Sequence, residues 1–149
     1  MGRWWRAIGV LAVVVILFAS APGLALAKTP GGTSTACHDD GFWKAHPDAW
    51  PVETVYVGGA AYTKTEAISI LRTPTKGDMT YVMWREVLSA QLNLAAVPTA
   101  PYLSPHALIE PLEFLTHYPL GSGVAASSET WAYYSAAAAR LDSFNNWRP

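Results

Sequence analysis

A stripe of apolar residues near the middle of the chain restricts the fold more than any other feature. Its members recur at the i, i+4, i+7 and i+11 spacing of one α-helical face: Met83, Val87, Ala90 and Leu94. Trp84, Leu88 and Leu92 widen this face, which predicts a central helix that is covered on more than one side. Asp78 is its expected N-cap. Four polar residues are assigned to the outer face: Arg85, Glu86, Ser89 and Asn93.

Capping and breaking residues predict further helices around this one. Thr63 and Glu66 have the spacing of a capping box, and four apolar residues follow before Pro74 ends the helix: Ala67, Ile68, Ile70 and Leu71. Residues 107–118 are expected to form a helix that is interrupted by Pro111 or begins near it. Ser127 or Ser128 is expected to cap a final helix, whose apolar positions are Trp131, Tyr134, Ala138 and Leu141.

Gly58 and Gly59 lie between two short runs of β-branched and aromatic residues within residues 54–62. Two glycines tolerate the positive φ values of a tight hairpin turn, so this segment is predicted to be a short β-hairpin. The predicted fold is mainly α: a small bundle of about four helices, with the hairpin placed after an N-terminal motif.

The first 27 residues have the layout of a secretory signal peptide. Arg3 and Arg6 precede an uncharged apolar run, and Ala25 and Ala27 supply small residues for cleavage. The alternative is a retained membrane anchor, since no charge occurs between Arg6 and Lys28. Residues 28–36 are predicted to be a flexible leader and residues 37–149 a single helical domain. We therefore expect the protein to be secreted, periplasmic or on the cell surface.

The charge of the mature chain excludes one class of partner. Residues 28–149 carry eight basic and eleven acidic side chains, a net charge of −3. Because a nucleic-acid surface requires a basic stripe, no nucleic-acid partner is expected. Contact with a membrane is expected only through an uncleaved signal segment.

Residues 37–51, called the motif below, combine the only cysteine with two histidines, two tryptophans and three aspartates. They could form a metal site, a reactive centre or an aromatic anchor for the fold. The metal-ligating types lack any familiar metal-binding spacing, and no G-x-S-x-G element occurs. No metal and no cofactor are therefore predicted, and the catalytic residues of any enzyme stay unknown.

Trp43 and Trp50 favour the aromatic interpretation, because large rings are mostly buried in folded proteins. Exposed tryptophans that stack on sugar rings are the alternative. With the indoles packed on the helices, Lys44 and His46 would lie at the rim, and these four residues are the candidate ligand-binding set. A pocket bounded by Lys44, His46 and Arg85 would indicate ligand binding.

Cys37 is unusual because an exported domain of this size normally has no cysteine or an even number. It could be a free thiol, a metal ligand or one half of an intermolecular disulfide. A homodimer linked through Cys37 is therefore one candidate assembly.

The sequence GFWKAHP at residues 41–47, followed by Trp50-Pro51, resembles the "GYWKNHP…WP" signature of a widespread family of exported bacterial proteins of uncharacterised function. Phe42 replaces the usual tyrosine of that signature, and Ala45 replaces the usual asparagine. The similarity continues through nearly all of the mature chain in several blocks: residues 57–59, 62–63, 70–71, 73–74, 77–78, 88–93 (LSAQLN) and 141–146 (LDSFNN).

The resemblance implies a surface-exposed, mainly helical module with no established activity, substrate or cofactor. Many members of the family carry a second cysteine after the LDxFNN segment, so the resemblance implies that Cys37 has lost its partner. We predict a non-catalytic module of the cell envelope or the extracellular space, whose partner is an envelope component or a glycan. The alternative is a secreted hydrolase or metal-dependent enzyme that uses the His and Asp residues around the motif.

Overall fold

The computed structural model describes residues 35–149, and the predicted signal peptide and most of the predicted leader lie outside the described residues. The elements follow one another in the order α1 (Asp40–Ala45), the 3-10 helix η1 (Pro47–Ala49), β1 (Thr54–Val57), β2 (Ala60–Thr63), α2 (Lys64–Arg72), α3 (Met79–Ala96), α4 (His106–His117) and α5 (Glu129–Asn145). The fold is mainly helical with one antiparallel hairpin, as the sequence predicts. Within residues 35–149, no helix is both long and apolar enough to cross a membrane.

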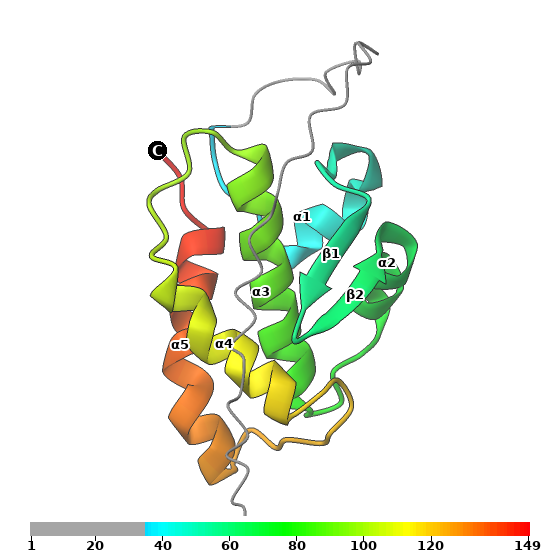
Figure 1. Ribbon diagram of the computed structural model, residues 1–149, viewed down its shortest axis with the longest axis vertical. Helices are drawn as coiled ribbons and strands as arrows, with labels where there is room; N and C mark the ends of the chain where they lie inside the picture. Colours follow the sequence, from blue (N-terminus) through cyan, green and yellow to red (C-terminus); the bar gives the residue numbers. More distant parts are fainter. Residues whose placement is uncertain (1–34) are drawn as a thin grey trace, which may run out of the picture.

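Helix α3 lies in the centre of the molecule (Figure 1). On one side it packs against α4 and α5, which also pack against each other. On the other side it contacts α1 and β1, while α2 lies against α1 and the hairpin. The stripe of residues 83–94 therefore forms a helix that is covered on two sides, because it carries apolar side chains around most of its circumference.

Local capping signals define where three of the helices begin. Thr63 accepts a hydrogen bond from the backbone N–H of Glu66, whose carboxylate accepts from the backbone N–H of Thr63 in return. The Asp78 carboxylate accepts from the N–H of Thr80 at 2.9 Å, and Ser128 caps α5. These contacts confirm the predicted capping box and the predicted Asp78 cap, and they select Ser128 over Ser127.

The β1–β2 hairpin turns at the two glycines. Gly58 and Gly59 have φ values of 60° and 81°, which suit a two-residue turn that matches the twist of the strands. Val57 pairs with Ala60 next to the turn. The predicted hairpin is confirmed.

The prediction for the outer face of α3 is wrong at three positions. Leu94, expected inside, is 45% exposed, whereas Ser89 and Asn93, expected outside, are almost fully buried. Leu94 lies near the C-terminal end of α3, on the side of the helix that faces solvent. Asn93 is buried because its amide meets polar backbone groups of the motif, and a periodicity of apolar residues contains no information about such partners.

Helix α4 passes through Pro111 without interruption, which corrects the expectation of a break or a start at that residue. Proline removes one backbone donor from a helix interior. Here its ring lies in the buried part of α4 together with Phe114 and Leu115, so packing of the apolar face offsets the lost hydrogen bond.

Candidate functional site

The two tryptophans of the motif lie inside the core. Trp43 is 1% exposed and Trp50 is 5% exposed. The Trp50 indole Nε1–H donates to the backbone oxygen of Trp43 at 2.8 Å, and the Trp43 Nε1–H donates to the oxygen of His38 at 3.1 Å. Both polar ends of the indoles are therefore satisfied by the motif's own backbone, and neither ring is available to stack on a sugar.

Short helices give the motif this conformation. Asp39 caps α1 by accepting from the N–H of Phe42 at 2.9 Å, and Lys44 in the last turn has the charge that favours a helix C-terminus. Pro47 then begins η1, because proline fits the first position of a helix. The seven-residue spacing of the tryptophans spans both helices and directs both indoles to the same core.

A buried network of hydrogen bonds joins the motif to α3 and α5, and we call it the asparagine network. The Asn93 side chain accepts from the backbone N–H of His38 and donates to its carbonyl oxygen, both at 2.8 Å. It also donates to the side-chain oxygen of Asn145 at 3.0 Å. Asn145 donates to the Glu86 carboxylate at 2.8 Å and to the Glu86 backbone oxygen. Each side-chain amide here has both donor and acceptor partners, as buried amides require.

Sequence reasoning missed this network, although one signal was available. Two blocks of the family resemblance contain the asparagines of the network: residues 88–93 end at Asn93, and residues 141–146 include Asn145. An asparagine within an otherwise apolar helix stretch indicates a buried polar contact when the residues around it are core-forming.

Glu86 is the group in the network whose acidity is most altered. Burial, together with the nearby charges of Asp142, Asp40 and Asp39, raises the pKa of the Glu86 carboxyl to about 7, and the hydrogen bond from Asn145 opposes this shift. A carboxylic acid with a pKa near neutrality can exchange a proton at physiological pH.

Three rings stack on one another along the outside of the motif, and we call them the ring stack. The His38 and Phe42 rings lie 3.6 Å apart between centroids at 12°, and the Phe42 and His46 rings 4.3 Å apart at 22°. His46 Nδ1 lies 3.0 Å from the backbone oxygen of Phe42. Partial burial, together with the positive charge of Arg148, lowers the pKa of His38, and Asp39 opposes this effect. His46 is exposed and Lys44 is half-buried.

The structure thus divides the candidate ligand-binding set. Trp43 and Trp50 belong to the core, whereas Lys44 and His46 lie at the surface, as the sequence predicts for the rim. Arg85 donates to the backbone oxygen of Thr73 and lies 3.9 Å from the carboxylate of Asp40 in the motif. A pocket of about 230 Å³ lies at the hairpin instead, and none of Lys44, His46 and Arg85 lines it.

Cys37 is completely buried. Its backbone N–H donates to the oxygen of Trp147 at 3.1 Å, and Arg148 donates to the Cys37 backbone oxygen. Burial raises the pKa of the Cys37 thiol, against the opposing effect of Arg148, so the thiol is a weak nucleophile in this setting. Linkage of two chains through Cys37 stays a prediction, and it would require this segment to separate from Trp147.

Metal-ligating residues do not gather within residues 35–149. No group of three or more His, Cys, Asp and Glu side chains in this part of the chain is arranged to hold a metal ion. His106 and His117 lie at opposite ends of α4, far from the motif histidines in sequence.

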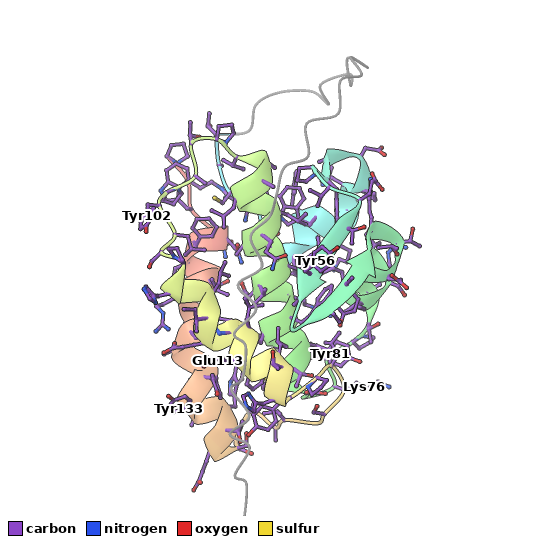
Figure 2. The ribbon with its side chains drawn as sticks, in the orientation of Figure 1. Tyr56, Lys76, Tyr81, Tyr102, Glu113 and Tyr133 are labelled. Atoms are coloured by element: carbon purple, nitrogen blue, oxygen red, sulfur yellow. The ribbon has the colours of Figure 1, made fainter. Side chains whose placement is uncertain are left out.

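The exposed tyrosines are also dispersed. Figure 2 shows Tyr56 on β1, Tyr102 on the segment before α4 and Tyr133 on α5, well apart from one another.

Comparisons of the chain with models of protein families, with curated proteins and with solved structures found no match. The resemblance to the exported bacterial family therefore stays a prediction that rests on the residues quoted for it.

Proposed function

We propose that this protein is an exported, non-catalytic module that binds a component of the cell envelope, such as a glycan, through the outer side of the motif. One observation supports the proposal above the others: the two indoles of the motif are buried in the core, whereas the ring stack and Lys44 are half-buried or exposed. A half-exposed stack of rings offers a flat apolar face to a polymer, and the imidazole nitrogens of its histidines offer hydrogen-bonding groups.

The support for a binding role also comes from rigidity. The asparagine network fixes His38 at one end of the ring stack, and the α1 C-cap fixes His46 at the other. A surface held in one conformation loses little side-chain entropy when a partner binds. The motif would thus act as a preformed contact surface on a helical scaffold.

The test is binding of the purified protein to cell-wall preparations and to a glycan array, with two matched variants. His46→Ala removes the outer ring of the stack. His117→Ala removes an exposed histidine of α4 whose Nδ1 lies 2.8 Å from the carbonyl oxygen four residues earlier, the same local arrangement as at His46. We expect His46→Ala to weaken binding at least tenfold and His117→Ala to leave it unchanged.

Absence of binding to any envelope fraction, or equal binding by the two variants, would contradict the proposal.

The alternative is a secreted hydrolase or metal-dependent enzyme. It predicts bound metal in the purified protein or an activity that His46→Ala abolishes. The Glu86 carboxyl, with a pKa of about 7, is the group that would suit acid–base chemistry. Its carboxylate, however, is already occupied by the Asn145 amide.

A further inference from the structure

A second surface feature, away from the motif, is the pocket beside the hairpin turn. It has a volume of about 230 Å³ and lies between the turn, one face of α3, and the C-terminal end of α4 with the segment that follows it. Figure 1 shows the β1–β2 turn ending beside α3, near that end of α4. Apolar side chains dominate its walls, among them Val57, Leu115, Pro119 and Leu120.

Tight packing holds one wall of the pocket in place. Gly58 approaches α4 so closely that a Cβ added to it would lie 2.8 Å from the Cβ of Leu115. Val57 and Leu115 are themselves buried in the core. At Gly59, in contrast, an added Cβ would meet nothing within 4 Å. The pocket therefore has a firm floor and an open rim.

Trp84 lines this pocket and carries a buried indole Nε1–H without a hydrogen-bond partner among residues 35–149. The side chain is 1% exposed. A buried donor without an acceptor is unfavourable, and the other two buried tryptophans of the core, Trp43 and Trp50, both have acceptors. The Trp84 ring lies edge-on to Tyr62, 5.4 Å between centroids, and Tyr62 also lines the pocket.

We propose that this pocket binds a small, mainly apolar ring compound that carries one hydrogen-bond acceptor, and that the acceptor takes the Trp84 Nε1–H. The apolar walls exclude a charged ligand, since they offer it no counter-charge. The size is adequate, because an apolar cavity of about 150 Å³ holds benzene. Because the Trp84 Nε1–H is buried, a side chain at the pocket wall must move for an acceptor to reach it, and the open space around Gly59 accommodates such a movement.

A pair of probes of equal size tests the proposal in the unmodified protein. Acetophenone has a carbonyl acceptor, and ethylbenzene has nearly the same shape without one. Titration of each into the purified full chain is followed by the tryptophan indole resonances in ¹H–¹⁵N spectra. We expect acetophenone to bind at least fivefold more tightly than ethylbenzene and to shift the Trp84 indole proton downfield.

Trp84→Phe keeps an aromatic ring and removes the donor, so the two probes should bind it equally. It also assigns the Trp84 resonance by its disappearance. Tyr133→Phe is the control, because Tyr133 is 75% exposed on α5 and does not line the pocket; it should keep the full preference. Equal binding of both probes to the unmodified protein would overturn the proposal, and so would binding of neither at its solubility limit, because neither readout depends on a variant.

Discussion

At the scale of single residues, one side-chain amide joins the motif to two helices. Asn93 makes two hydrogen bonds with the backbone of His38 and a third with Asn145, so it connects α3 to the residues before α1 and to α5. Both amides are buried, so water does not readily replace a partner that either of them loses. The position of the ring stack therefore depends on a residue that belongs to none of its rings.

Asn93→Ala should lower the free energy of unfolding by about 3 kcal/mol, because it removes the acceptor of the His38 N–H and the donor to the buried Asn145 side-chain oxygen. Urea unfolding followed by tryptophan fluorescence measures the loss. Asn146→Ala is the matched control, since the exposed Asn146 amide bonds only to Asp142 within α5, and it should cost less than about 1 kcal/mol. Similar losses in both variants would show that the network does not hold the motif.

Glu86 makes the stability of the fold depend on pH. Its pKa is about 7 in the folded protein against an ordinary value of 4.5, so the folded state binds the proton more strongly than the unfolded state. The stability that comes from this protonation is fully present below pH 4.5, and it is lost as the pH rises towards 7 and above. The loss amounts to at most about 3 kcal/mol.

Glu86→Gln should remove that loss, because a neutral amide still offers an oxygen to Asn145. We expect the variant to match the unmodified protein near pH 4.5 and to exceed its unfolding free energy by about 2–3 kcal/mol near pH 8. Urea titrations at the two pH values measure the difference. Glu113→Gln, at an exposed position of α4 (Figure 2), is the control and should leave the pH profile unchanged; an identical profile for Glu86→Gln would contradict the assignment.

At the scale of elements, the structure separates features with local causes from those with distant ones. The capped starts of α2 and α3 and the Gly58-Gly59 turn follow from residues within a few positions of one another, and the sequence predicts all of them. The burial of Asn93 depends on His38, 55 residues away, and the continuity of α4 at Pro111 depends on packing. Neither the contact with His38 nor the packing of α4 can be predicted from a local sequence pattern.

The same distinction applies to the candidate site. Burial of Trp43 and Trp50 was predictable from side-chain size, and the placement of Lys44 and His46 at the surface follows from it. The ring stack has a regular four-residue spacing in the sequence, but His38 precedes the helix, so spacing alone does not predict that it stacks. The Trp84 pocket could not be predicted, because its walls come from the hairpin, α3 and the end of α4.

Docking of the hairpin onto α4 should be sensitive to one glycine of its turn and less sensitive to the other. Both have positive φ values, so alanine strains either backbone by about 1–2 kcal/mol. Only Gly58→Ala also places a Cβ against Leu115, at 2.8 Å, which adds about 1–3 kcal/mol of overpacking. Thermal unfolding should therefore show Gly58→Ala to be clearly less stable than Gly59→Ala, and equal midpoints would mean that the turn does not rest on α4.

At the scale of the whole molecule, the described chain closes on itself where Cys37 meets the segment after α5. The N–H of Cys37 bonds to the oxygen of Trp147, and Trp147 packs against the same core in which Cys37 is buried. Residue 147 follows the LDSFNN block directly, where the resemblance implies a second cysteine. The fold therefore brings together the two positions that a disulfide would join.

Trp147→Cys should form an internal disulfide with Cys37. Backbones joined by a hydrogen bond of 3.1 Å lie within the Cα separation that a disulfide spans, about 4.4–6.8 Å. Because the bridge would close a loop of about a hundred residues, the oxidised variant should exceed its own reduced form in unfolding free energy by about 4–5 kcal/mol in the chain-entropy model. Comparing the two redox forms of one variant removes the loss of Trp147 packing from the measurement.

Mass spectrometry and thiol titration detect the disulfide, and urea unfolding with and without reductant measures its effect on stability. Unmodified protein on a non-reducing gel tests the Cys37-linked homodimer in the same experiment. Free thiols, or covalent dimers of the Trp147→Cys chain, would show that the two segments do not meet in solution.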